Sequence, residues 1–304
     1  MENEKKSAFV AVIGRPSAGK STLINKFCNA KVSIVSATPQ TTRNSIRGIV
    51  TQDAGQLVFV DTPGRHKSEK KLNLKLVQTA DRVQNESDLI LYVLDATRKP
   101  GPEEENVAAN IPAGMLGGQT FIAINKIDSP NADTAASYNF IKKNIPLIKQ
   151  EHIFEISALN GTGTDSLGNA LFLAAPIGPL YYDTEMYTDQ SVKFRIAEII
   201  REQTMNRLRE ELPHAIYVEV ADAELKEPKD DAGTEKLWVR AFILTERESQ
   251  KGMVVGKNGK MIRAIRLASL AELSKIFDWK IDLDLRVKTS RDWRQDDSFL
   301  RNFV

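Results

Sequence analysis

The segment GRPSAGKS, from Gly14 to Ser21, has the residue types and spacing of a phosphate-binding loop. Glycine lets backbone N–H groups turn toward phosphate oxygens, Lys20 can reach the β- and γ-phosphates, and a Ser21 hydroxyl can ligate Mg²⁺. Alone, the pattern also fits a glycine-rich turn before a helix. An apolar run before it and a helical pattern after it favour nucleotide binding. The predicted nucleotide-binding residues are Gly14, Ser17, Ala18, Gly19, Lys20, Ser21 and Thr22.

Two later motifs place acidic residues just after apolar runs. In DTPG, Asp61 can hold the Mg²⁺ shell, and the N–H of Gly64 can donate to a γ-phosphate. In NKID, which contains Asn125 and Asp128, a carboxylate can accept two N–H bonds from the edge of guanine. Adenine lacks that pair of donors, so the sequence favours GTP as substrate and GDP as product.

Further groups are expected beside the base. We expect the stem of Lys126 to pack over the base plane. In the motif SALNG, we expect Ser157 and the backbone N–H of Ala158 to reach the guanine from a later loop. The alternative interpretation of Asn125 and Asp128 is an Asx turn after a strand.

Strand-like apolar runs alternate with helix-like stretches through the first 175 residues. This pattern indicates an α/β fold, with a mostly parallel sheet and helices on both faces. The predicted strands are 8–13, 57–60, 88–94, 120–124 and 153–156. We expect a GTP-binding domain over residues 1–175, a linker over 176–190 with two prolines, and a second domain over 191–304.

The second domain is predicted to be α+β. Its expected order is a helix over about 192–212, strands near 215–220 and 237–244, another helix, and a last strand. In that strand apolar and charged residues alternate from Ile281 to Lys288, which indicates one buried and one wet face. The polar stretch 227–235 is expected to be a solvated hairpin loop or an insertion.

The segment VVGKNGK contains a GxxG loop that opens the second helix of this domain. Such a loop lets a nucleic-acid backbone approach closely, because glycine has no side chain and a helix N-terminus favours phosphate. A glycine pair before a helix is also a common turn. Because the loop lies within an α-β-β-α-β pattern, we predict RNA binding by Gly256, Lys257, Asn258, Gly259, Lys260 and Arg263.

A second basic group lies near the end of the chain and has two interpretations. Its residues either extend the RNA surface by phosphate contact and stacking, or are solvated charges around a capping tryptophan. They are Arg286, Lys288, Arg291, Trp293 and Arg294.

Overall charge and hydropathy limit the partners. The chain has 304 residues, with 42 Lys and Arg against 40 Asp and Glu, so the formal net charge is +2. A net charge this small is not typical of proteins that bind nucleic acid over their whole surface. Any RNA contact must therefore be confined to a local basic region, and we do not expect DNA as a partner. No apolar run could span a bilayer and the N-terminus is polar, so we expect a cytoplasmic protein. The lone Cys28 is expected to be a core thiol.

Taken together, these motifs resemble the Era family of bacterial ribosome-assembly GTPases, in which a P-loop GTPase domain precedes a type II KH domain. The resemblance includes the segment PQTTR, from Pro39 to Arg43. In that family this segment is the first switch and supplies a threonine to Mg²⁺. We assign that role to Thr42, with Thr41 as the alternative; without the flanking motifs both would lie in a polar loop.

The resemblance also implies cofactors, a target and a role. It implies Mg²⁺ held by Ser21, Thr42 and Asp61, and catalysis by Lys20, Thr42 and Gly64. The family's KH domain binds the 3′ region of 16S rRNA, which implies a role in maturation of the 30S ribosomal subunit.

Other roles stay open. Peripheral contact with the inner face of the cell membrane is reported for the family as a class, although no basic amphipathic stretch here predicts it. One alternative is an RNA-binding chaperone whose nucleotide is mainly structural. Another is an assembly GTPase that acts on a different RNA target.

Three positions depart from the family pattern, one of which is Asn258, where the family often has glycine. Family members usually have asparagine in place of Ser17, and in related GTPases that asparagine helps to hold an activating K⁺, so we expect K⁺ dependence to be weak. Arg65 follows DTPG, where small GTPases place a glutamine that orients water. Arginine cannot accept the proton of that water. It either points to solvent or a partner, or donates to the transition-state charge, and we expect slow intrinsic turnover.

Overall fold

The computed structural model describes residues 4–36, 38, 41–62, 71–226, 235–291 and 293, with only the backbone described over 71–75. The chain divides into two compact units: the first is built chiefly from residues up to Asp189, and the second chiefly from Gln190 onward. The predictions for Gly64, Arg65 and Arg294, and for most of the polar stretch 227–235, lie outside the described residues.

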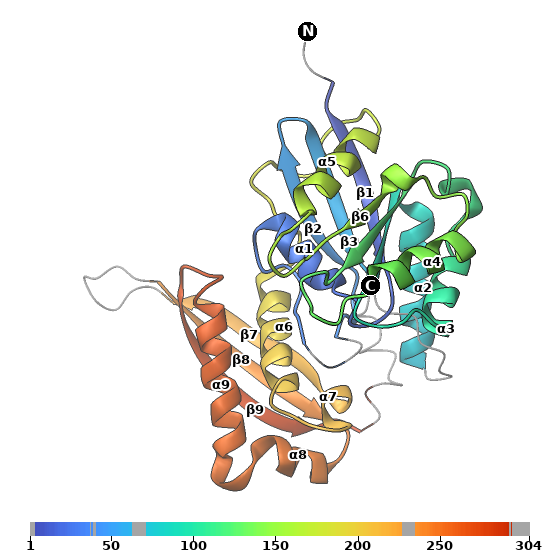
Figure 1. Ribbon diagram of the computed structural model, residues 1–304. Helices are drawn as coiled ribbons and strands as arrows, with labels where there is room; N and C mark the ends of the chain where they lie inside the picture. The colour runs from blue at the N-terminus through green and yellow to red at the C-terminus, as the bar shows by residue number, and fades with distance from the viewer. Residues whose placement is uncertain are drawn as a thin grey trace. The chain divides into compact units, whose positions relative to one another are not determined.

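Within the described residues, the first unit contains a six-stranded sheet, drawn in blue to green in Figure 1. Its strands are β1 (Lys6–Ile13), β2 (Ile46–Gln52), β3 (Gly55–Asp61), β4 (Leu89–Asp95), β5 (Thr120–Asn125) and β6 (Ile153–Glu155). Their order is β2-β3-β1-β4-β5-β6, and all pairs are parallel except the antiparallel hairpin β2–β3. The mostly parallel sheet confirms the predicted fold class.

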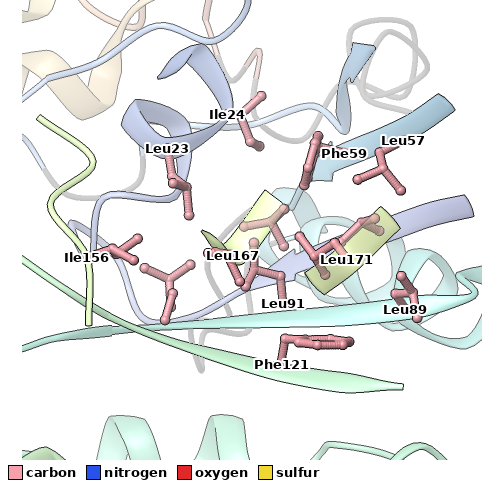
Figure 2. Packing of buried hydrophobic residues seen from close by; sticks show 14 of the residues in the cluster. Leu23, Ile24, Leu57, Phe59, Leu89, Leu91, Phe121, Ile156, Leu167 and Leu171 are labelled. Carbon is pink, nitrogen blue, oxygen red and sulfur yellow. The ribbon is translucent and has the colours of Figure 1, made fainter. Parts of the chain in front are cut away.

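Helices cover both faces of this sheet. Along β4, the odd-numbered residues Leu89 to Val93 pack in one cluster with α1 (Lys20–Cys28) and α5 (Thr164–Ala174), shown in Figure 2. The even-numbered residues Ile90 to Leu94 pack in another with α3 (Pro102–Ala109) and α4 (Thr134–Asn144). Alternate side chains of a strand point to opposite faces, so a strand covered on both sides is apolar throughout. The remaining long helix is α2 (Lys71–Glu86).

Strand β2 was missed in the sequence. Its residues, IRGIVTQ, mix apolar and polar side chains without a clean alternation, because β2 lies at the edge of the sheet and is only partly buried. Strands β1, β3, β4 and β5 are recognisable because most of their residues are buried, which gives long apolar runs.

Residues 176–189, most of the predicted linker, lie against the sheet of the first unit. The buried Gln56 side chain accepts from the N–H of Tyr182 and donates to its carbonyl oxygen, both at 3.0 Å. On β2, the Ile49 N–H donates to the Tyr187 carbonyl oxygen at 3.0 Å. The segment therefore contacts β1 at Pro176, β3 at Tyr182 and the outer edge of β2 at Tyr187.

The second unit is a three-stranded sheet with helices, in yellow to red in Figure 1. Its elements are α6 (Val192–Met205), α7 (Leu212–Ala215), β7 (Tyr217–Lys226), β8 (Lys236–Thr245), α8 (Glu248–Val255), α9 (Lys260–Leu273) and β9 (Lys280–Thr289). The order is β7-β8-β9, with β7–β8 antiparallel and β8–β9 parallel. A parallel neighbour requires a crossover, which α8 and α9 provide.

Two predictions for this unit were wrong in detail. The first helix does not reach residue 212 but ends at Met205, and Glu210 beyond it has a left-handed backbone (φ 56°) that no α-helix contains. The predicted α-β-β-α-β order lacks the short helix α7 and also α8, whose sequence ESQKGMVV includes Gly252 and has only Val254 buried. Among the residues that the structure describes, every helix falls short of the length or apolar character that a membrane crossing requires.

Candidate nucleotide-binding and RNA-binding sites

The phosphate-binding loop joins β1 to α1 and requires unusual backbone angles. Gly14, Ser17 and Gly19 have φ values of 148°, 63° and 98°. A Cβ on Gly14 would collide with the Val93 carbonyl oxygen, and one on Gly19 with the Asn125 amide. Glycine is therefore needed at both positions, for conformation and for space.

Lys20 lies within this loop. Its Nζ donates to the carbonyl oxygens of Gly14 and Arg15 at 2.8 and 2.9 Å, and its side chain is buried. Burial lowers the pKa of Lys20, and this effect outweighs the opposing attraction of Asp61. The ammonium group is thus held where the loop would surround a phosphate.

The predicted Mg²⁺ ligands come together from three segments. Ser21 Oγ donates to Asp61 Oδ2 at 2.6 Å, and Thr42 Oγ1 lies 3.2 Å from both Asp61 Oδ2 and Ser21 Oγ. Within the described residues, Asp61 Oδ1 is buried and makes no well-aligned hydrogen bond, although the Ser33 side chain is close enough to lower the pKa of Asp61. An all-oxygen group with an unsatisfied carboxylate oxygen fits Mg²⁺. The contact to Asp61 is made by Thr42, the threonine assigned in preference to Thr41.

Asn125 joins three loops by its side-chain amide. Its Nδ2 donates to the Ala18 carbonyl oxygen and its Oδ1 accepts the Ala158 N–H, both at 2.9 Å. The Ala158 N–H that we expected at the guanine is therefore engaged by Asn125. Ser157 is fully buried, with Oγ accepting the Asn160 N–H at 3.3 Å.

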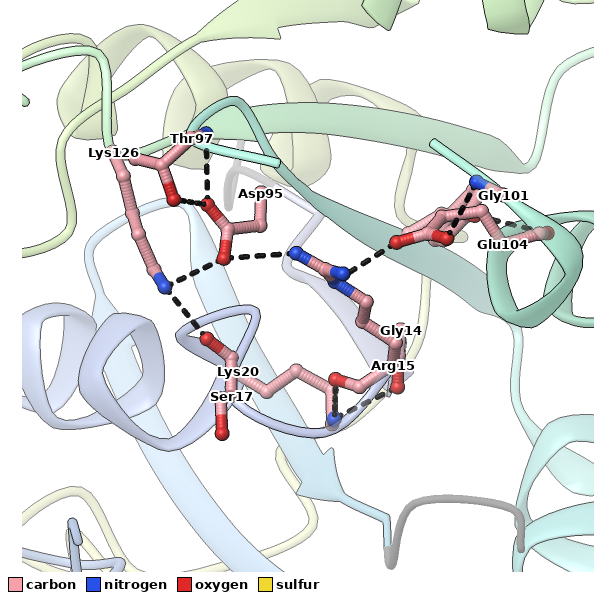
Figure 3. A network of polar contacts seen from close by, with 10 residues as sticks. Gly14, Arg15, Ser17, Lys20, Asp95, Thr97, Gly101, Glu104 and Lys126 are labelled. Atoms are coloured by element: carbon pink, nitrogen blue, oxygen red, sulfur yellow. Dashed lines mark hydrogen bonds and ion pairs between the residues drawn. The ribbon is translucent and has the colours of Figure 1, made fainter. Parts of the chain in front are cut away.

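The other residues predicted around the nucleotide have different surroundings. Asp128 is exposed on the loop after β5, and Thr22 is partly exposed in the first turn of α1. Lys126 has a left-handed backbone (φ 68°), and its Nζ donates to the Ser17 carbonyl oxygen and to Asp95 Oδ2, each at 2.7 Å (Figure 3). The end of the Lys126 side chain is thus directed at the phosphate-binding loop.

In the second unit, the GKNG loop follows α8 and leads into α9. Gly256, Asn258 and Gly259 have φ values of 73°, 54° and 71°, which are left-handed. Asparagine tolerates such angles, so Asn258 fits the loop. The exposed predicted RNA-binding residues are Lys257, Asn258, Lys260 and Arg263.

Two further residues of the second unit, Arg266 and Trp293, make structural contacts. Arg266 Nε donates to the Leu283 carbonyl oxygen at 2.6 Å, so this arginine ties α9 to β9. Trp293 is fully buried, and its Nε1 donates to the Ala215 carbonyl oxygen at 3.2 Å. The suggestion that Trp293 stacks on RNA is therefore wrong, because its ring lies in the core beside Tyr217.

Comparisons with known proteins identify the family. Residues 9–126 match the family model described as 50S ribosome-binding GTPase, and residues 211–294 match the model of the KH domain. The chain is 48% identical to GTPase Era of Treponema denticola, over 97% of this chain and 98% of that protein. The chain belongs to the Era family of GTPases. GTPase Era of Borreliella burgdorferi is 41% identical, over 98% of this chain and 99% of the relative.

Solved Era structures share the fold of this Era-family GTPase. A variant of Aquifex aeolicus Era bound to GDP and AlF4⁻ aligns with a TM-score of 0.89 and 32% identity, covering 98% of each chain. Era in complex with MgGDPNP and nucleotides 1506–1542 of 16S ribosomal RNA aligns with the same TM-score, identity and coverage. The predicted fold, a P-loop GTPase domain followed by a KH domain, is confirmed.

Three charged residues around the nucleotide site of this Era-family GTPase were not predicted. Arg15, Asp95 and Glu104 form buried ion pairs beside the phosphate-binding loop (Figure 3). Asp95 ends β4, just as Asp61 ends β3, so the rule that parallel strands meet at their carboxyl ends would have found it. Glu104 lies on α3 and has no such signal.

Proposed function

We propose that this Era-family GTPase is a GTP-driven switch that binds the 3′ region of 16S rRNA through its GKNG loop and acts in maturation of the 30S subunit. The observation that carries this proposal is the exposed loop, Lys257 to Lys260, in a chain that aligns over 98% of its length with Era in complex with 16S rRNA nucleotides. At Gly259 an added Cβ would meet no described atom within 4 Å, so this end of the loop leaves room for an RNA backbone.

For the nucleotide, we propose that the loop from Gly14 to Thr22 holds the phosphates and that Asp128 recognises guanine. The exposure of Asp128 leaves its carboxylate open to a base. Ser21, Thr42 and Asp61 would hold Mg²⁺, which supplies positive charge against the phosphates when bound. The three residues form a hydrogen-bonded group in which, among the described residues, Asp61 Oδ1 accepts no well-aligned hydrogen bond.

For catalysis, we propose roles for Lys20, Thr42 and Gly64. Lys20 offers a buried ammonium group inside the loop, where it can donate to developing phosphate charge. Thr42 and Gly64 would hold the γ-phosphate in the GTP state and be released by hydrolysis. Thr42 lies four residues before β2, so a movement of Thr42 on its release would also displace the start of that strand.

The RNA target is tested by crosslinking the protein to RNA in cells and sequencing the RNA joined to it. Crosslinks at Lys257 that map to the 3′ region of 16S rRNA would support the proposal. A second candidate, action on the large subunit, is favoured by the description of the family model that matches residues 9–126. Recovery of large-subunit RNA alone would support that candidate and contradict ours.

Two further parts of the proposal have separate tests. If the nucleotide were mainly structural, as in an RNA chaperone, purified protein with GTP and Mg²⁺ would release no phosphate. We also propose that the protein acts in the cytoplasm with the 30S subunit as partner. Cell fractionation should then recover it with soluble ribosomal particles, whereas recovery only with membranes would contradict this location.

A further inference from the structure

A buried chain of charged side chains adjoins the phosphate-binding loop (Figure 3). Arg15 Nη2 lies 3.1 Å from Asp95 Oδ2, and Arg15 Nε lies 2.8 Å from Glu104 Oε1, an ion pair rather than an aligned hydrogen bond. The side chains of Arg15, Asp95 and Glu104 are 7%, 3% and 5% exposed. Removing one partner of such a group leaves an unpaired charge in the interior, which is strongly destabilising.

The second oxygen of each carboxylate, the one that does not face Arg15, accepts hydrogen bonds that hold the group in place. Asp95 Oδ1 accepts the N–H and the hydroxyl of Thr97 at 2.9 and 2.6 Å. Glu104 Oε2 accepts the N–H of Gly101 at 3.0 Å, at the start of α3. Because each acid is anchored to backbone, the two together fix the position of the Arg15 guanidinium.

The Asp95 carboxylate also contacts the NKID segment, through Lys126. Asp95 Oδ2 accepts from Lys126 Nζ at 2.7 Å, and Lys126 donates to the Ser17 carbonyl oxygen at 2.7 Å. The phosphate-binding loop is thus tied to Asp95 twice, directly at Arg15 and through Lys126 at Ser17. In addition, the Arg15 carbonyl oxygen accepts from Lys20 Nζ at 2.9 Å.

We propose that Arg15, Asp95 and Glu104, here named the loop brace, are positioning residues. They hold the phosphate-binding loop at a fixed position relative to the NKID segment. The brace acts through Lys126 and the backbone of the loop at Arg15 and Ser17 rather than by contact with the nucleotide. Loss of the brace then speeds the release of GDP and GTP alike and raises KM, while kcat at saturation stays nearly unchanged. The proposal concerns the family's GTPase activity alone, so its test contains no RNA and is independent of the proposed ribosomal role.

The first test is Arg15→Met, which keeps the length of the side chain and removes the charge. We expect the dissociation rate of fluorescently labelled GDP to rise at least about tenfold and KM for GTP to rise similarly. We expect kcat to stay within about twofold. The control, Lys149→Met, breaks an exposed 3.6 Å pair with Glu151, the one ion pair of Lys149 among the described residues, and should change none of these. Wild-type GDP release from folded Arg15→Met would overturn the proposal.

A double variant separates positioning from stability. Arg15→Met leaves Glu104 charged and buried without its partner, and adding Glu104→Gln removes that charge. We expect the double variant to recover much of the lost melting temperature but to release GDP as fast as Arg15→Met, because the loop still lacks its direct tie to Asp95. Recovery of GDP affinity together with the melting temperature would show a purely structural role and overturn the proposal.

A third variant covers the case in which Arg15→Met fails to fold. Asp95→Asn keeps the size of the side chain and weakens both ties to the phosphate-binding loop. It should speed GDP release and raise KM with little change in kcat. A wild-type release rate from folded Asp95→Asn would overturn the proposal.

Discussion

Ser21 Oγ donates to Asp61 Oδ2 at 2.6 Å across 40 residues of sequence, so the first turn of α1 and the end of β3 share one short hydrogen bond. The Asp61 side chain is fully buried. Burial raises its pKa above the ordinary carboxyl value, and this effect exceeds the lowering by Lys20 and by the hydrogen bond from Ser21. The hydrogen bond thus involves a carboxylate whose charged form is disfavoured by burial. A bound cation would stabilise that charged form.

Asp61→Asn should therefore stabilise the protein in the absence of nucleotide and Mg²⁺ at neutral pH. A carboxyl whose pKa is higher in the folded state binds more protons there, so its contribution to stability falls as pH rises from the unfolded toward the folded pKa. Melting temperatures of both proteins from about pH 4 to pH 8 test this. The advantage of the variant should grow with pH; parallel curves would contradict the prediction. The variant should also lose Mg²⁺-dependent GTP hydrolysis.

Asp128→Asn should exchange the preference for guanine for a preference for xanthine. The carboxylate is expected to accept two N–H groups of guanine, and a site built for such donors discriminates by about 10⁴ in favourable cases. Competition between labelled GTP and xanthosine triphosphate measures the change. Asp133→Asn in the same loop is a matched control, because its side chain caps α4 by accepting the Ala136 N–H at 2.9 Å and asparagine caps equally well. Retained GTP preference in Asp128→Asn would refute the assignment.

Gly259→Asn and Gly259→Asp should fold but bind RNA weakly. A Cβ at this position has no neighbour within 4 Å, and both residue types tolerate the left-handed φ of 71° better than most. The new side chain would stand where the RNA backbone approaches, and the charged one would also repel phosphate. We expect a moderate loss of affinity for a 16S 3′-end oligonucleotide with asparagine and a larger one with aspartate, with GTP hydrolysis unchanged. Normal RNA binding by the aspartate variant would show that this loop is not the RNA site.

GTP hydrolysis should proceed at equal rates in K⁺ and in Na⁺. Ser17 stands where the family resemblance leads us to expect asparagine, and its exposed side chain ends in a hydroxyl group, with no amide oxygen to hold K⁺ beside the phosphates. Ser17→Asn should introduce stimulation by K⁺, since asparagine accepts the left-handed φ of 63° found there. Strong K⁺ stimulation of the wild-type chain would contradict the first expectation.

The sequence predicted the parts of the site that depend on strand ends and glycine. Asp61 and Asn125 follow buried apolar runs, and parallel strands bring such ends to one edge of the sheet, so their convergence could be foreseen. Gly14 and Gly19 were recognisable because the loop needs their backbone freedom.

Partners of long side chains could not be foreseen. Nothing in the pattern of α3 marks Glu104 as the partner of Arg15, because that contact depends on how α3 packs beside β4. The same holds for the Ala158 N–H, which donates to Asn125 in a geometry that only the folded loops define. Edge strand β2 and helix α8 were missed because neither has a strong apolar period.

The contact of Tyr187 with the outer edge of β2 has a consequence for fragments that contain only the GTPase unit. The Tyr187 carbonyl oxygen covers the Ile49 N–H on an edge strand that would otherwise offer free hydrogen-bonding groups to another polypeptide. A fragment that stops at Ala175 would uncover that edge and leave the Gln56 amide without Tyr182. We therefore expect such a fragment to self-associate and one that ends at Asp189 to stay monomeric, which sedimentation of the two fragments would distinguish.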